Sequence, residues 1–132
     1  MFELRSSAFS EGDALPVRFT CEGDDVSPPL SWSDVPEGAS ELRLSLTDPD
    51  APRGTFTHWL VTGIEPSSSD VGQGMVPAGG TESRNDFGEA AYGGPCPPQG
   101  HDPHRYIFTI EALGASGDVL ATAQLRATFG RS

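Results

Sequence analysis

Residues 42–52 read LRLSLTDPDAP, in which an alternating apolar pattern runs into a turn rich in Asp and Pro. Over residues 42–47 leucines alternate with polar residues, which is the period-two pattern of a strand with one buried face. Two aspartates follow, and two prolines on either side of the second aspartate fix the backbone. We therefore predict a strand that aims the carboxylates of Asp48 and Asp50 from its end, although a plain Asp/Pro turn has the same pattern.

Four more segments are predicted as strands. Residues 16–20 form one, and residues 55–62 (TFTHWLVT) are rich in β-branched and aromatic side chains. Apolar side chains alternate through residues 105–113 and again through residues 119–129, where the alanines also allow a helical turn at the start. The 16 glycines and 12 prolines leave little room for long helices. The chain is therefore predicted to form one all-β domain over residues 1–132.

The charge is strongly acidic, with 19 Asp and Glu against 8 basic residues and a net charge of -11 at pH 7. All eight basic residues are arginine. A GC-rich genome also favours Arg over Lys, but codon bias alone would make Arg abundant, and here it is sparse. An acidic, lysine-free surface suits concentrated salt, which screens self-repulsion, so a halophilic source is predicted. Nucleic-acid binding needs a basic face and is excluded.

The sequence also allows predictions of the cellular location and of the redox state of the two cysteines. No apolar run reaches the roughly 20 residues that span a bilayer, and the N-terminus lacks the basic-then-apolar order of a secretory signal. We expect a cytoplasmic protein. Cys21 and Cys96 lie in no metal-binding pattern, and two reduced thiols are expected in that compartment. A single disulfide is the alternative.

Residues 65–104 join two predicted strands and are dominated by Gly, Pro, Ser and Asp. So long an irregular segment in a compact domain is usually functional. Residues 93–106 read GGPCPPQGHDPHRY and cover the end of this segment and the start of the next predicted strand. Four prolines stiffen the chain there. Period-two alternation then points His104 and Tyr106 one way and Arg105 the other.

A second histidine, His58, lies inside a predicted strand on the same face as Phe56. A lone histidine in such a strand is more often a satisfied core residue than a functional one. A neighbouring carboxylate would favour its charged form and let it carry a proton near neutral pH.

Several ordered motifs together resemble one family. They are DPDAP at residues 48–52, FTHW at 56–59, NDFG at 85–88, GGPCPP at 93–98 and HRY at 104–106. This order is similar to the phosphatidylethanolamine-binding protein family, also called the Raf kinase inhibitor protein family, and most to its bacterial and archaeal branch. The resemblance implies a Greek-key β-sandwich with few short helices. It also implies a surface pocket that accepts phosphate-like anions and phospholipid headgroups.

The resemblance further implies which residues form that pocket. The ligand-binding residues would be Asp48, Asp50, His58, Pro98, His104 and Tyr106. The wall and rim would be Pro49, Pro52, Gly94 and Cys96. Residues 114–117 replace a longer helical insertion of many relatives, and no counterpart of the C-terminal helix follows residue 129, so a more open site is implied.

The backbone between the two carboxylates and the next strand is expected to reverse sharply. We predict a cis peptide bond between Ala51 and Pro52, because only an X-Pro bond reaches the cis form at a cost of about 0.5–1 kcal/mol.

The predicted function is binding of a phosphate-like anion or a phospholipid headgroup, such as phosphoethanolamine, without a cofactor. Two aspartates in so acidic a chain should repel a simple anion. Protonated His58 and His104, or a zwitterionic ligand, must therefore offset them.

Two other classes of function stay open. The first is a regulatory module that binds or inhibits a protein such as a kinase or a protease, and bacterial relatives also imply a homodimer. The second is a metal-dependent hydrolase in which Asp48, Asp50, His58 and His104 together hold a divalent metal, since mixed His and carboxylate sets suit zinc or manganese. The sequence contains no nucleophile with a partnered base, so we predict no enzymatic activity.

Overall fold

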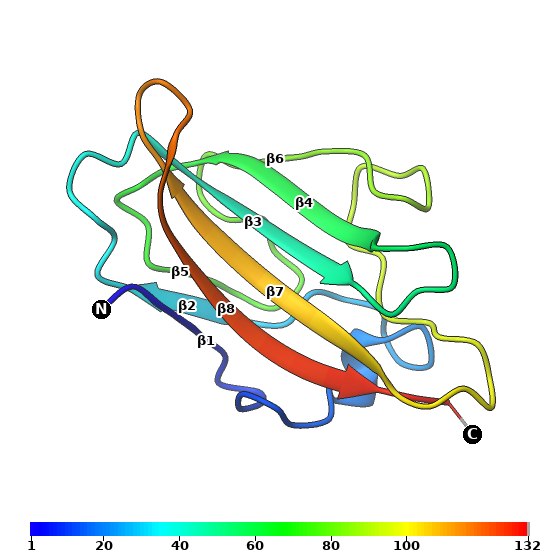
Figure 1. Cartoon of the computed structure of the whole chain (residues 1–132). Coiled ribbons are helices and arrows are strands. Elements are labelled where there is room, and N and C mark those ends of the chain that lie inside the picture. The colour runs from blue at the N-terminus through cyan, green and yellow to red at the C-terminus, as the bar shows by residue number, and fades with distance from the viewer. Residues whose placement is uncertain (132) are drawn as a thin grey trace.

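The computed structural model describes residues 1–131 and contains two antiparallel sheets (Figure 1). The smaller sheet has the order β1-β2-β5 and consists of Glu3–Arg5 (β1), Leu30–Ser33 (β2) and Asp70–Val71 (β5). The larger sheet has the order β6-β4-β3-β7-β8 and consists of Thr81–Glu82 (β6), Phe56–Ile64 (β4), Glu41–Asp48 (β3), His104–Leu113 (β7) and Val119–Phe129 (β8). A short 3₁₀ helix, Val17–Phe19 (η1), is the one helical element of the described residues.

The two sheets share one apolar core. Every second residue of β3 is buried, and the same alternation runs through most of β7, because successive side chains on a strand point to opposite faces. Leu4 of β1 and Trp32 of β2 belong to the same buried cluster. The predicted all-β fold is therefore confirmed.

The long predicted strands are confirmed and the short N-terminal one is wrong. Residues 119–129 are a strand from end to end. Residues 16–20 instead contain η1, because local hydrogen bonds close a turn: the Phe19 amide donates to the Pro16 carbonyl (3.1 Å) and the Thr20 hydroxyl donates to the Val17 carbonyl (2.8 Å). Strands β1, β2, β5 and β6 were not predicted, because two to four residues are too few to show a period-two pattern.

The topology gathers three strand ends at one place. β3 lies between β4 and β7 and is antiparallel to both, so the last residue of β3 lies near the first residues of its neighbours. Asp48 is the last residue of β3, Phe56 the first of β4 and His104 the first of β7. These ends lie on the right of Figure 1, where loops also gather.

Residues 114–118 join β7 to β8 by a tight turn in which the Gly114 amide donates to the Asp118 carbonyl (2.8 Å). This short connection agrees with the shortened insertion expected from the sequence.

Among residues 1–131, no helix has the length and apolar character needed to cross a membrane.

Candidate functional site

Asp48 is the buried carboxylate of the site, with only 3% of its surface exposed. One carboxylate oxygen accepts the backbone amide of Asp50 (2.8 Å), so the side chain fixes the turn that follows β3. The other oxygen accepts a hydrogen bond from Nδ1 of His104 (2.7 Å). These two hydrogen bonds, one to the turn and one to β7, hold the carboxylate inward at the strand end.

His58 is held at a β-bulge. Leu46 pairs with Trp59 and Thr47 pairs with Thr57, so His58 is an extra residue on β4 with no partner on β3. A bulge of this kind redirects a side chain and is common beside functional sites. Nδ1 of His58 lies 2.8 Å from the Gly93 carbonyl oxygen.

The protonation of His58 follows from these surroundings. Because a carbonyl can only accept, Nδ1 is assigned the proton, and in the neutral ring Nε2 is an acceptor. Burial lowers the pKa of His58 below its usual value, although the Gly93 carbonyl and the charge of Asp48 act against this shift. His58 is therefore neutral at pH 7.

Tyr106 lies between the two histidines and is completely buried. Its ring centroid lies 5.5 Å from that of His58 and 6.3 Å from that of His104. Burial raises the pKa of Tyr106, and so do the charge of Asp48 and the closeness of its carboxylate to the hydroxyl, so the hydroxyl keeps its proton. Among residues 1–131, this hydroxyl is the one fully buried side-chain polar atom without a hydrogen-bond partner.

Asp50 is directed away from Asp48 and pairs with Arg105. Its carboxylate accepts from Nη2 (2.8 Å), Nε (3.0 Å) and the backbone amide (2.8 Å) of Arg105. These hydrogen bonds from Arg105 lower the pKa of Asp50 to about 2. The pair fastens the loop after β3 to the start of β7.

A cavity of about 180 Å³ opens where these strand ends meet. Five residues proposed from the sequence line it: Asp48, Pro52, His58, Cys96 and Tyr106. Four further lining residues were not proposed: Ala51, Phe56, Phe87 and Pro97. Phe56 shared a predicted face with His58, and Phe87 belongs to the NDFG motif, so both had a sequence signal.

The remaining proposed residues lie elsewhere. Asp50 and His104 line an adjoining opening of about 500 Å³ together with Arg105 and His101. Gly94 lines an adjoining cleft of about 250 Å³, which shares Phe87 and Cys96 with the cavity. Pro49 and Pro98 line none of these three hollows. The sequence suggested one pocket, whereas the structure has two openings separated by the hydrogen-bonded pair of Asp48 and His104.

Asn85 holds one side of the cavity although it does not line it. Its amide nitrogen donates to the carbonyl oxygens of Ala91 (2.7 Å) and His58 (3.3 Å). Its side-chain oxygen accepts the amides of Phe87 (2.9 Å) and Glu89 (3.1 Å). One buried side chain therefore ties the bulge of β4 to the turn that carries Phe87.

Cys21 and Cys96 form a disulfide with their Cα atoms 5.4 Å apart, so the expectation of two reduced thiols is wrong. The two residues are 75 positions apart in sequence, and only the fold brings them together. Beside the bridge, the Cys21 amide donates to the Pro95 carbonyl (3.1 Å). The Gly94 amide donates to Asp25 (2.7 Å), and a Cβ on Gly94 would lie 2.4 Å from that carboxylate oxygen. Gly94 therefore allows a close approach of the loop to Asp25.

The predicted cis bond between Ala51 and Pro52 is also wrong, since residues 1–131 contain no cis peptide bond. The chain reverses through a turn in which the Gly54 amide donates to the Ala51 carbonyl (3.1 Å). Gly54 has a φ of 106°, a conformation that is favourable for glycine, so the reversal does not need a cis proline.

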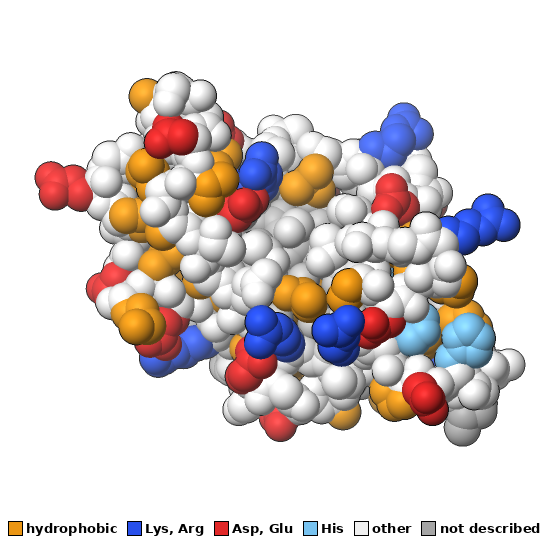
Figure 2. Space-filling view, in the orientation of Figure 1, with side chains coloured by type: hydrophobic (Ala, Val, Ile, Leu, Met, Phe, Trp, Pro, Cys, Tyr) orange, Lys and Arg blue, Asp and Glu red, His pale blue; other side chains and the backbone are white. Residues whose placement is uncertain are grey.

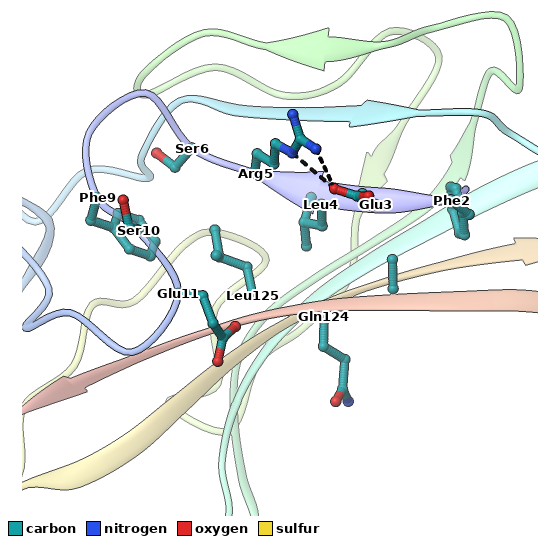
Figure 3. Close-up of a pocket in the computed structure, with 11 residues that line it drawn as sticks. Phe2, Glu3, Leu4, Arg5, Ser6, Phe9, Ser10, Glu11, Gln124 and Leu125 are labelled. Carbon is teal, nitrogen blue, oxygen red and sulfur yellow. Dashed lines mark hydrogen bonds and ion pairs between the residues drawn. The ribbon is translucent and has the colours of Figure 1, made fainter.

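A larger hollow of about 440 Å³ lies between β1 and β8 (Figure 3). It contains none of the site residues proposed from the sequence. Arg5 and Glu3 on its rim are hydrogen-bonded to each other, and its other walls are mainly Phe2, Leu4, Phe9 and Leu125. The smaller cavity beside Tyr106 carries the unsatisfied polar chemistry, so we take that cavity as the candidate site.

The surface around the site mixes charges of both signs. Figure 2 shows acidic and arginine side chains scattered over the visible face, with histidine reaching the surface at the lower right. In the described part of the chain no group of three or more His, Cys, Asp or Glu side chains could hold a metal ion. The set of four metal ligands considered from the sequence is not assembled, because Asp50 is paired with Arg105.

Comparison with known proteins identifies the family of the chain. The family model described as phosphatidylethanolamine-binding protein matches residues 5–131. A UPF0098 protein of Aquifex aeolicus is 45% identical over 117 residues, which cover 86% of this chain and 68% of the relative.

Two solved structures are similar along nearly the whole chain. One is YbcL of Escherichia coli, described as a member of the mammalian PEBP family. It has a TM-score of 0.93 and is 30% identical, and the alignment covers 99% of this chain and 99% of YbcL. A phosphatidylethanolamine-binding protein homologue of Chlamydia trachomatis has a TM-score of 0.89 and 35% identity, with 99% of this chain and 98% of that chain covered. These likenesses confirm the type of sandwich that the sequence motifs implied.

Proposed function

Because the chain belongs to the phosphatidylethanolamine-binding protein family, a family of binding proteins, we propose that its cavity binds a phospholipid headgroup or a related phosphate ester, with phosphoethanolamine as the reference ligand. The observation that carries this proposal is the Tyr106 hydroxyl, which is buried and has no partner among the described residues. A buried polar group left unpaired costs about 1–3 kcal/mol, and a ligand atom in the cavity would remove that cost.

The two histidines support a ligand that has both donors and acceptors. Each histidine uses Nδ1 on a protein acceptor, which leaves Nε2 free for a ligand. Nε2 of neutral His58 accepts, so it suits an N–H or O–H donor and not a phosphate dianion. A zwitterionic headgroup has an ammonium donor and phosphate acceptors, and it therefore fits better than inorganic phosphate.

The charge of the surroundings points the same way. The cavity lining contains one formally charged side chain, Asp48, in a chain of net charge -11. The headgroup of a phosphodiester lipid has no net charge and enters such a field at little electrostatic cost, and the ammonium of phosphoethanolamine offsets part of the phosphate charge that would repel a small dianion.

The test is a calorimetric or NMR titration of the protein with phosphoethanolamine, followed by the variant Tyr106→Phe. A hydrogen bond to a charged ligand group contributes about 1.5–3 kcal/mol, so Kd should rise roughly 10- to 150-fold in this variant. The fold should tolerate the change, because the hydroxyl has no protein partner to lose.

Tyr92→Phe is the matched control. The Tyr92 hydroxyl donates to the Phe19 carbonyl (2.6 Å) and does not line the proposed cavity. This variant should lose about 0.5–1.5 kcal/mol of stability and keep its affinity. An unchanged Kd in Tyr106→Phe, or no binding by the unaltered protein, would refute the proposed function.

A further inference from the structure

The Cys21–Cys96 disulfide lies where solvent can reach it. Cys96 is exposed and lines both the cavity and the adjoining cleft of about 250 Å³. Cys21 is half-buried and lines the cleft but not the cavity. Thiol–disulfide exchange begins when a thiolate attacks one of the two sulfurs, so its rate depends on access to that sulfur. Of the two residues, Cys96 is the more open to an incoming thiolate.

The backbone on both sides of Cys96 is held without the disulfide. Pro95 and Pro97 are buried, and their rings fix the backbone angle φ. The Pro95 carbonyl accepts the Cys21 amide (3.1 Å). The Pro97 carbonyl accepts a hydrogen bond from Nε of Arg131 (2.7 Å). Cys96 therefore projects from a fixed stretch of chain, and breaking the S–S bond does not require this stretch to unfold.

The charge around the disulfide favours some thiols over others. The cleft that both cysteines line also contains the carboxylates of Asp25 and Glu89, and no cationic side chain of residues 1–131 lines it. Arg131 is close by, but its guanidinium lies 3.9 Å from the carboxylate of Glu22. In a chain of net charge -11, an incoming anion is therefore repelled at this cleft. A thiol that also carries an ammonium group offsets the negative charge of its own thiolate.

We propose that the disulfide exchanges with small thiols while the protein stays folded, that Cys96 is the residue attacked, and that positively charged thiols are preferred. In the first step a thiolate RS⁻ bonds to Sγ of Cys96, the Cys21–Cys96 bond breaks, and Cys21 leaves as a thiolate. The product is a mixed disulfide between Cys96 and R. A second thiolate then attacks the sulfur of R, which releases R–S–S–R and the Cys96 thiolate. The protein disulfide gains two electrons, two thiols are oxidised, and both cysteine thiolates take protons from water.

The site of attack is tested on the full-length, oxidised protein with cysteamine as the probe. After a brief exposure, free thiols are blocked with N-ethylmaleimide, and peptide mass spectrometry locates both modifications. We expect cysteamine on Cys96 and the maleimide on Cys21. Cysteamine found mainly on Cys21, or equally on both residues, would overturn the assignment of Cys96. Phosphoethanolamine is absent from this experiment, so the result does not depend on the proposed function.

The rate of disulfide loss shows whether exchange takes place in the folded protein. Direct attack should be nearly independent of urea at concentrations well below the unfolding transition. Exchange that required global unfolding would be slower than exchange with a short disulfide-bonded peptide by about 10³-fold or more, because so small a fraction of molecules is unfolded. It would also accelerate steeply with urea. A rate with these two properties would overturn exchange in the folded state.

The preference for charge is tested with cysteamine, β-mercaptoethanol and mercaptoethanesulfonate. After correction for the thiolate fraction of each, cysteamine should react about tenfold faster than the sulfonate at low salt, the lower end of electrostatic effects on encounter rates. At about 1 M potassium chloride, where the Debye length is about 3 Å, the rates should converge. Glu89→Gln should narrow the difference at low salt. Glu37→Gln, at an exposed carboxylate that does not line the cleft, is the matched control and should leave it unchanged. Equal rates for the three thiols at low salt would overturn the preference.

Discussion

Removing the Cys21–Cys96 disulfide is expected to lower the free energy of unfolding by about 4.5 kcal/mol. The bridge joins residues 75 positions apart. In the chain-entropy treatment of cross-links, a loop of that length restricts the unfolded chain by about 15 cal/mol/K, which is about 4.5 kcal/mol at 25 °C. Domains of this size are stable by about 5–15 kcal/mol in total, so the bridge is predicted to supply a large part of the stability.

The measurement is urea unfolding of the oxidised protein, of the same protein after reduction, and of the double variant Cys21→Ser/Cys96→Ser. Reduced protein and double variant should agree, which controls for the serine substitutions. Backbone hydrogen bonds on both sides of the bridge stay available in each case, including that from the Cys21 amide to Pro95. A loss below about 1 kcal/mol in both would refute the chain-entropy reasoning for this protein.

The disulfide should also matter for binding, because Cys96 lines the cavity. Reduction is expected to weaken phosphoethanolamine binding under conditions in which the protein is still folded. If affinity stays unchanged, other contacts are sufficient to hold this wall, such as the hydrogen bond from Nε of Arg131 to the Pro97 carbonyl (2.7 Å).

Two further predictions concern charge. Asp50 has its pKa lowered to about 2 by Arg105, so its contribution to stability should be present above pH 4 and lost as the pH falls toward 2. The melting temperature of Asp50→Asn should therefore lie below that of the unaltered protein at pH 7, and the two values should converge near pH 2. The control is Asp24→Asn at an exposed carboxylate, whose melting temperature should show no such convergence. The halophilic source stays a proposal. Asp48 is the one buried carboxylate among residues 1–131, so the other carboxylates repel one another at or near the surface. This repulsion should weaken, and the folded state should become more stable, as the Debye length falls from about 30 Å at 0.01 M to about 3 Å at 1 M salt. A melting temperature that does not rise between these two potassium chloride concentrations would contradict it.

The cellular location stays a prediction. The cytoplasmic expectation rests on the N-terminal residues and on the lack of an apolar run of roughly 20 residues. Disulfides are more usual in oxidising compartments, so the bridge between Cys21 and Cys96 makes that expectation worth testing by fractionation of the source cells.

The sequence alone determined the parts of the molecule that depend on local pattern. Alternation of apolar residues identified β3, β7 and β8, because the side chains of a strand point to opposite faces. The same period placed His104 and Tyr106 inward and Arg105 outward, as their burial shows. The ordered motifs were sufficient to identify the family, because they combine residue type with position along the chain.

Only the tertiary structure decided which of the proposed residues share a cavity. Asp50 looked equivalent to Asp48 in the sequence, but Arg105 lies within hydrogen-bonding reach and holds it away. His58 owes its place to a bulge, which is a mismatch between two strands and leaves no mark in either strand alone. The disulfide and the Phe87 wall join segments that are far apart in the chain. Contacts of this kind depend on how strands, turns and loops pack against one another, and that packing sets distances which no local pattern of residues encodes.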